Sequence, residues 1–370
     1  MRVFLAQAPA DFCSDAPLDN IVSIDPNGDL VLVVGANLVG SSSTMFNAEK
    51  TVAFRVDYRT LARNSSVFKT MFDTKSDNYK PGTSEFGWTE HLPDASPVGL
   101  EFLFLVAHYG GFSKVPDSQS LQEIYEIVEM ALKYKMFNSL KGKAKPWFFG
   151  SYEGVAPNTF LITPSTSATE LSKIRSIAIT LGHRALTTRV IAYIISGSYI
   201  HNGHLHFDGE DLEDPKLDFS SSRIRYLKHN RLKVLREMCN ALHSFMRQLQ
   251  GMAAYDPSLK CPNHRSQNVE EDICESTALG TLERALIRLG EWPLPEPEHM
   301  DSWSISTLEA AWCALKIRGF SDAIQKRHRK YECDWASKLH QRIKTAAEIL
   351  IAFSKKTEDE MKERAAMVGL

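Results

Sequence analysis

The sequence predicts an α+β protein, with a small sheet and its helices in the N-terminal part and a mostly α-helical region after it. Three observations predict this class. Leu30–Val34 is an uninterrupted apolar run, which is typical of a strand buried on both faces. Phe54 and Val56 alternate like the end of a second strand. From residue 167 onward, apolar residues recur at the spacing of amphipathic helices.

The segment after Val56 predicts two short helices. Asp57 stands where a helix N-cap would, just before Tyr58–Leu61, and Ser65 can cap a second helix through Phe68 and Phe72. The segment lacks the glycines of a phosphate loop and the Gly-x-Ser-x-Gly pattern of a nucleophile elbow. Because apolar residues dominate it, we interpret it as structural.

The next elements are marked by turn and cap residues. Residues 37–47 are rich in Gly and Ser and predict a long, exposed hairpin loop. Trp88–Leu92 can form a short strand. Ser96-Pro97 starts a helix that is apolar nearly all round, so we expect it to be buried or part of an interface. Ser120-x-x-Glu123 is a capping box that starts another helix.

Several of these segments together resemble the core of a BTB/POZ domain, of the type common in fungal proteins. The resemblance covers residues 20–145 and is carried, in order, by Gly28–Gly35 with its Asp-led strand, Phe54–Phe72, Trp88–Asp94, Phe102–Tyr109 and Leu121–Tyr134. It implies a small β-sheet flanked by helices, and protein binding chiefly by homodimerisation. The chain departs from the family at Asp57 and Tyr58, where many members have a histidine followed by a basic residue near the charged pocket of the dimer.

The resemblance and the composition shifts predict four regions. We expect a tail over residues 1–18, a BTB/POZ domain over 19–145, a linker over 146–166 and an α-helical C-terminal domain over 167–370. The linker is expected because Lys141–Pro146 is a basic, Gly- and Pro-containing break, followed by a Pro-, Ser- and Thr-rich stretch.

Apolar stripes and cap residues predict five helices in residues 167–370. The capping box Ser167-x-x-Glu170 leads into the first of them. Gly290 and Gly319 are expected to stop two of the others, and the charged end from Lys355 onward is expected to fray. The stripes run over 171–181, 224–249, 279–289, 308–315 and 339–350.

Composition and charge favour an intracellular globular protein. The chain has 370 residues, 43% of them hydrophobic, and a formal net charge of −2, so no global basic field points to nucleic acid. Six cysteines in a chain of this length do not form a secreted disulfide framework. No apolar run approaches a membrane span, and the start of the chain is too short for a signal peptide. We expect a cytoplasmic or nuclear location.

Catalytic motifs are missing from the sequence. There is no Gly-x-Gly-x-x-Gly, no Walker loop and no His-Glu-x-x-His. His108 lies in an apolar helix, and we interpret it as a hydrogen-bonded interior histidine rather than a base. His201, His204 and His206 invite a metal, but no carboxylate or cysteine spacing completes a site, so we interpret them as an exposed turn. We predict no enzyme activity and no small-molecule substrate.

One constellation favours a structural zinc ion. Cys261, His264 and Cys274 fall in and just after the polar stretch between two predicted helices, and Cys333 would be the fourth ligand, with Cys239 as the alternative. A long polar loop in a compact domain is uncommon unless something holds it. The opposing interpretation is that these are unrelated reduced cysteines.

The function that follows is protein–protein interaction: a BTB-mediated homo- or hetero-dimerisation scaffold with a helical, partner-binding half. One alternative is a substrate adaptor of a cullin-type ubiquitin ligase, because many BTB/POZ proteins recruit a cullin. The other is a nuclear transcriptional regulator, suggested by the basic runs Lys141–Lys145 and Lys326–Lys330, although no DNA-binding motif accompanies them.

Overall fold

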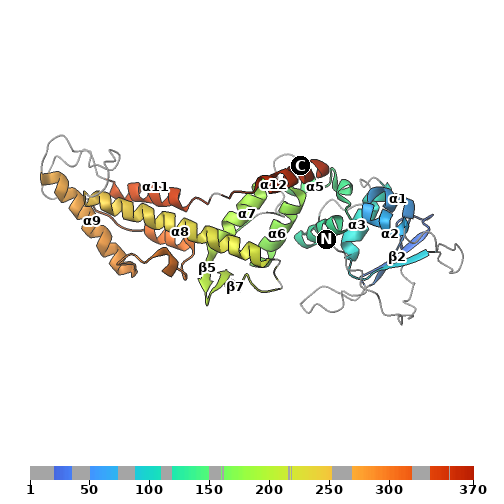
Figure 1. Cartoon of the computed structure of the whole chain (residues 1–370), viewed down its shortest axis with the longest axis horizontal. Coiled ribbons are helices and arrows are strands. Elements are labelled where there is room, and N and C mark those ends of the chain that lie inside the picture. The colour runs from blue at the N-terminus through green and yellow to red at the C-terminus, as the bar shows by residue number, and fades with distance from the viewer. Residues whose placement is uncertain are drawn as a thin grey trace. The chain divides into compact units, whose positions relative to one another are not determined.

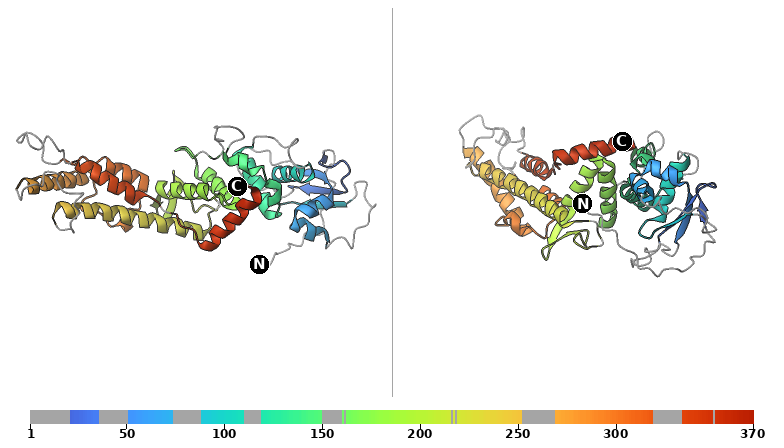
Figure 2. Two further views of the ribbon diagram at one scale, coloured as in Figure 1. Left: turned by 90° about the horizontal axis from the view of Figure 1, so that it is seen from above. Right: turned by 45° about the vertical axis from the view of Figure 1, so that its right-hand side comes forward.

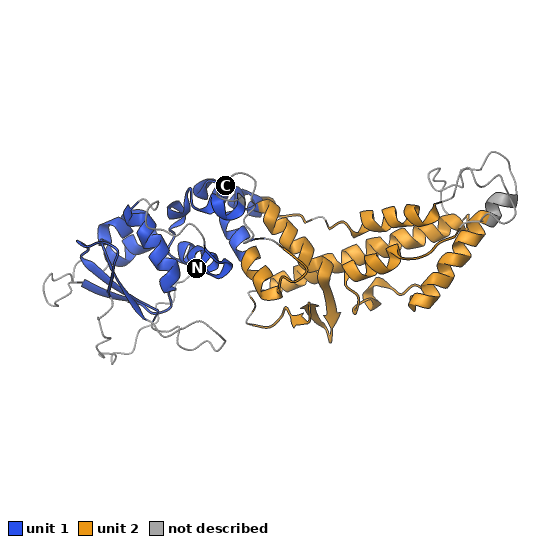
Figure 3. Ribbon diagram, turned by 180° about the vertical axis from the view of Figure 1, so that it is seen from behind, with its two compact units in different colours: residues 1–161, 176–183, 356–370 blue, residues 162–175, 184–355 orange. Residues whose placement is uncertain are grey.

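The computed structural model is an α+β protein (Figure 1). It describes residues 21–35, 51–73, 88–109, 119–149, 160, 162–215, 217, 219–251, 269–318, 334–349 and 351–370. The expected tail, the hairpin loop over 37–47 and the basic run Lys326–Lys330 lie outside these residues. The chain forms two compact units (Figure 3). Unit 1 comprises Met1–Leu161, Ser176–His183 and Lys356–Leu370, and unit 2 comprises Ile162–Arg175 and Arg184–Lys355.

Unit 1 contains a four-stranded sheet in the order β1-β3-β2-β4. β2 runs antiparallel to β3 and parallel to β4, and β1 runs parallel to β3. All five residues of β2 are buried, which confirms the expectation of a strand covered on both faces. The strands are β1 (Ile21–Ser23), β2 (Leu30–Val34), β3 (Val52–Val56) and β4 (Trp88–Leu92).

Several helices of unit 1 begin at predicted caps. Asp57 accepts hydrogen bonds from the backbone N–H groups of Arg59 and Thr60, and Ser65 Oγ accepts one from Phe68 N at 3.0 Å. Ser120 and Glu123 form the expected capping box. The helices are α1 (Tyr58–Asn64), α2 (Ser66–Asp73), α3 (Pro97–Tyr109), α4 (Leu121–Lys133), the 3₁₀ turn η4 (Phe137–Leu140), α5 (Ala144–Phe149) and α12 (Lys355–Val368).

Aromatic rings fill the core of unit 1. The ring of Phe68 stacks on Tyr134 at 4.7 Å, and Phe54 meets Phe104 edge-on at 5.7 Å. Leu61 and Phe68 are completely buried. At Gly99, α3 approaches α4 so closely that an added Cβ would lie 2.6 Å from the carbonyl oxygen of Glu126. The glycine therefore sets the spacing between these two helices.

Two features of unit 1 differ from the sequence-based expectation. Residues 144–149 form α5 rather than entering a linker, because Trp147 is buried against Phe102 and donates to Gln119 Oε1 at 2.9 Å. The charged C-terminal segment forms the separate helix α12 rather than a frayed end, because Met361 and Val368 are buried.

The approach of α12 depends on one glycine. At Gly182 an added Cβ would lie 2.0 Å from the carbonyl oxygen of Met361, and the φ of Gly182 is +80°. This packing brings Ser176–His183 and Lys356–Leu370 into unit 1, whereas the sequence placed all of 167–370 in one helical domain.

Unit 2 is built on the long helix α8 (Ser221–Leu249), and α9 and α11 lie alongside it (Figure 2). Trp312 and Trp335 are among its fully buried side chains. The other elements are α6 (Ala168–Leu181, shared with unit 1), α7 (Arg184–Gly197), β5 (Ser198–His201), β6 (His204–Phe207), β7 (Glu210–Asp211), α9 (Val269–Leu289), the 3₁₀ turn η7 (Pro297–His299), α10 (Ile305–Cys313) and α11 (Trp335–Ala347). All the predicted helices of this region are therefore present, and a three-stranded sheet was not foreseen.

A buried arginine ties this sheet to the segment before α10. Arg231 is 2% exposed. Its Nε donates to the Ser198 carbonyl at 3.2 Å, and its Nη2 donates to the carbonyls of Met300, Asp301 and Trp303 at 2.9, 3.1 and 2.6 Å. The guanidinium thus replaces its lost hydration with backbone acceptors.

Candidate functional site

The structure describes one of the four residues of the expected zinc site. Cys274 is completely buried and lies in α9, within the second turn of that helix. Cys261, His264 and Cys333 lie outside the described residues, so the zinc site stays a prediction.

The alternative fourth ligand, Cys239, has the surroundings of a structural thiol. It is buried in α8, and its Sγ lies 3.6 Å from Met300 Sδ. Burial, together with the nearby carboxylates of Glu291, Glu296 and Glu298, raises the pKa of Cys239 to about 12. Zinc binds the thiolate, so this environment disfavours Cys239 as a ligand.

The three histidines that follow α7 lie on a β-hairpin rather than in a loop. Asn202 and Gly203 connect β5 to β6 with positive φ at both residues, as a two-residue type I′ turn requires. Asp208 and Gly209 make the same kind of connection from β6 to β7. The second turn brings Asp211 opposite His206, and so supplies the carboxylate that the sequence spacing did not reveal.

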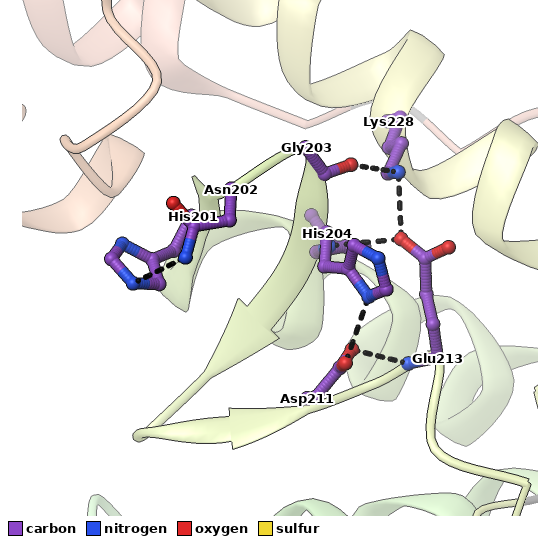
Figure 4. A network of polar contacts seen from close by, with 8 residues as sticks. His201, Asn202, Gly203, His204, Asp211, Glu213 and Lys228 are labelled. Carbon is purple, nitrogen blue, oxygen red and sulfur yellow. Dashed lines mark hydrogen bonds and ion pairs between the residues drawn. The ribbon is translucent and has the colours of Figure 1, made fainter.

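A polar network joins this sheet to α8 (Figure 4). We call it the hairpin network and define it by His204, Asp211, Glu213 and Lys228. His204 Nδ1 lies 2.9 Å from Asp211 Oδ2, and Glu213 N donates to Asp211 Oδ1 at 2.8 Å. Lys228 Nζ lies 2.6 Å from Glu213 Oε1 and donates to the Gly203 carbonyl at 2.7 Å. Glu213 Oε1 also accepts from Leu205 N at 3.0 Å.

The donor set of this network could hold a metal ion, since the ligand atoms of His204, Asp211 and Glu213 all lie within 4.8 Å of one another. The ammonium group of Lys228, however, already forms an ion pair with Glu213. Burial opposes ionisation of both carboxyls. Hydrogen bonds from the Glu213 backbone and His204 nevertheless lower the pKa of Asp211, and those from Lys228 and the Leu205 backbone lower the pKa of Glu213. Donors within the fold therefore favour the charged form of both carboxyls, and the geometry of the network fits a structural role.

In unit 1, His108 is hydrogen-bonded through both ring nitrogens. Its Nδ1 lies 2.9 Å from the Phe104 carbonyl, and its Nε2 accepts from Asp57 N at 3.1 Å. These partners assign the proton to Nδ1. The expectation of a hydrogen-bonded histidine is confirmed, although the side chain is half-buried rather than fully buried.

The two positions that depart from the family pattern take part in local packing. Burial opposes ionisation of Asp57, but hydrogen bonds from Thr60 and Arg59 lower the pKa of this N-cap carboxyl. Tyr58 N donates to Asp29 Oδ1 at 3.2 Å, and the Tyr58 ring lies against Trp88 at 5.6 Å. Asp29, the residue that leads β2, thereby fixes the start of α1.

One surface of α3 is apolar and only partly covered. We call it the α3 face and define it by Val98, Glu101, Leu105 and Tyr109, which recur at helical spacing along one side. Val98 is 44% exposed, Leu105 is half-buried and Tyr109 is exposed. Glu101 is exposed, and its partial burial raises the pKa of its carboxyl. The opposite side of α3, with Leu100, Leu103 and Phe104, is in the core.

No protein-family model, curated protein or solved structure matches this chain. Among the described helices, none is both long and apolar enough to cross a membrane. Recruitment of a cullin and a role in the nucleus stay predictions.

Proposed function

We propose that unit 1 is a BTB-type protein-interaction module that self-associates through the α3 face, and that unit 2 is the half that receives a second protein. The observation that carries the proposal is the character of α3. The helix is apolar nearly all round, yet the described residues of unit 1 bury only one side of it fully. Such a helix is typical of an interface.

The arrangement of unit 1 supports the family assignment. The resemblance implies a small sheet flanked by helices, and residues 21–149 form a four-stranded sheet with α1 to α5. The quoted segments fall on β2, on β3 with α1 and α2, on β4, and on α3 and α4, in the expected order. Asp57 and Tyr58 have partners within unit 1, so their departure from the family pattern leaves the α3 face unchanged.

A second copy is the occupant that fits the α3 face best. Two copies related by a two-fold axis would bring Val98 and Leu105 against the same residues of the partner and remove their surface from water, at about 25 cal/mol per Å². Glu101 lies between them, and its raised pKa means that burial already disfavours its charge. Self-association should therefore be tighter when Glu101 is protonated.

The experiment is sedimentation equilibrium of the full chain and three variants. Val98→Glu and Leu105→Glu each place a charge on the α3 face and should weaken the dimer at least about tenfold. Leu132→Glu is the matched control, because Leu132 is similarly exposed, at 41%, but lies on α4. Equal weakening by all three variants, or by none, would contradict the proposed surface. Circular dichroism checks that each variant is folded.

A further inference from the structure

A groove in unit 2 gathers cations that form no ion pair with any residue that the structure describes. It has a volume of about 650 Å³ and lies between the last turns of α9 and the segment from the end of α10 to residue 318. Four of its lining residues are cationic and exposed. We call it the basic groove and define it by Arg284, Arg288, Lys316 and Arg318.

The sequence builds this groove from two separate segments. Arg284 and Arg288 stand at i and i+4 on α9 and so share one face of that helix. Thr281 Oγ1, one turn earlier, accepts a hydrogen bond from Arg318 N at 3.0 Å. This bond holds residues 314–318 along α9 and brings Lys316 and Arg318 to the same groove.

The charge of the groove is uncompensated. None of the described residues that line it carries a carboxylate. Within the described part of the chain, none of the four cations forms an ion pair. The whole chain has a net charge of −2, so the excess of positive charge is local. Like charges this close repel one another, and an anionic partner would relieve that repulsion.

The floor of the groove is apolar and decides which kind of anion fits. It is formed by small and aliphatic side chains, including Ala285, Leu289, Ala311 and Leu315. Ile287, beside Arg288 on α9, is 56% exposed. No aromatic side chain of the described lining offers a base a stacking surface, as single-stranded nucleic acid requires. A helix with aliphatic residues on one face and carboxylates beside them matches both the floor and the four cations.

We propose that the basic groove binds an acidic amphipathic helix of a partner protein. This inference rests on the partner-binding role proposed for unit 2 and is separate from self-association by unit 1, since its site lies entirely in unit 2. Variants of the α3 face should leave it intact, so the failure of one proposal does not decide the other.

The test is fluorescence anisotropy with the full chain and a labelled peptide of about 16 residues, built from Leu at helical spacing and Glu elsewhere. We expect saturable binding that weakens as salt rises from about 50 to about 300 mM. The double variant Arg284→Glu, Arg288→Glu should bind this peptide at least about tenfold more weakly. Arg225→Glu is the matched control, because Arg225 is an exposed arginine of α8 outside the groove, and it should bind like the wild type.

Two further probes separate the apolar from the electrostatic contribution. A peptide with Ser in place of Leu should bind at least about tenfold more weakly than the Leu peptide, because it cannot use the floor. A single-stranded DNA of equal charge should also bind more weakly. Equal or tighter binding of the DNA would overturn the proposal in favour of a nucleic-acid site. Failure of the double variant to weaken the Leu peptide would overturn the groove assignment.

Discussion

Two groups of cations in unit 2 differ in whether the fold supplies acceptors for them. Arg231 and Lys228 lie where the fold supplies their acceptors: four backbone carbonyls for the first, and Glu213 with the Gly203 carbonyl for the second. The four cations of the basic groove have no ion pair in the described part of the chain. A compensated charge stabilises the fold, whereas an uncompensated cluster stabilises nothing until a partner arrives.

Glu101 extends this comparison to unit 1. It is the one carboxyl of the α3 face, and burial raises the pKa of this carboxyl. We therefore distinguish structural charges from binding charges by their partners within the fold rather than by their type. Substitution should destabilise the protein at the first kind of position and leave it unchanged or more stable at the second.

The largest effect is expected at Arg231. Arg231→Leu removes the guanidinium that donates to the carbonyls of Ser198, Met300 and Trp303 in a buried site, and should lower the free energy of unfolding by about 3 kcal/mol. Urea unfolding measures this loss. Arg284→Leu is the matched control and should change the stability by less than about 0.5 kcal/mol. Similar losses of stability in both variants would contradict the distinction between structural and binding charges.

A smaller and pH-dependent effect is expected at Asp211. Asp211→Asn removes the charge that faces His204 and should cost less than about 1 kcal/mol at pH 7, because the pair is partly exposed. The pKa of Asp211 is lowered in the fold, so its contribution is present above the ordinary value of 3.8 and is lost as the pH falls through the lowered value. Unfolding measured from pH 7 down to pH about 2.5 should show the two proteins converging. A constant difference would mean that the hairpin network depends on packing rather than charge.

The opposite sign is expected at Glu101. The pKa of Glu101 is raised in the folded protein. Its contribution to stability is therefore fully present below the ordinary pKa of 4.5, and it is lost as the pH rises through the raised pKa. Glu101→Gln should therefore raise the melting temperature at pH 7 and leave it unchanged at pH 4 or below, where the carboxyl is protonated. Glu123→Ala is the contrasting variant, because it removes the acceptor that completes the capping box with Ser120, and it should lower the melting temperature at pH 7.

The smallest effect is expected in the basic groove itself. Arg284 and Arg288 are like charges at i and i+4, an arrangement that destabilises a helix by a few tenths of a kcal/mol. Arg284→Gln relieves this repulsion and keeps Arg288, the cation in the last turn of α9. It should therefore stabilise the protein by up to about 0.5 kcal/mol in low salt, and the gain should disappear in high salt. A loss of stability would reveal an acceptor for Arg284 and would remove it from the binding group.

The sequence predicted elements wherever one local signal decides the structure. The buried run of β2, the cap at Asp57 and the capping boxes at Ser120 and Ser167 all mark elements that the structure contains. It missed the β5–β7 sheet, because apolar residues resume at Tyr199-Ile200 after only Ser196-Gly197-Ser198, so that α7 and β5 resemble one apolar segment. The Asn202-Gly203 and Asp208-Gly209 pairs were the signal that could have revealed both turns.

The sites were harder to predict because they depend on contacts between distant segments. The three histidines were evident, but Lys228 reaches their network from α8. The basic groove depends on the hydrogen bond from Arg318 N to Thr281 Oγ1, which holds the chain after α10 against α9. The spacing of residues in the sequence does not predict this bond. Arg231 lies on the buried side of the amphipathic helix α8, although arginines are ordinarily exposed. The backbone carbonyls around it explain its burial.

The central claim is that the uncovered, apolar α3 face makes this chain a protein-interaction module, and light scattering coupled to size exclusion tests it most directly. The full chain at micromolar concentration should elute with about twice the monomer mass of 41.6 kDa. Val98→Glu should elute at the monomer mass under the same conditions. A wild-type protein that stays monomeric across the micromolar range would contradict the claim.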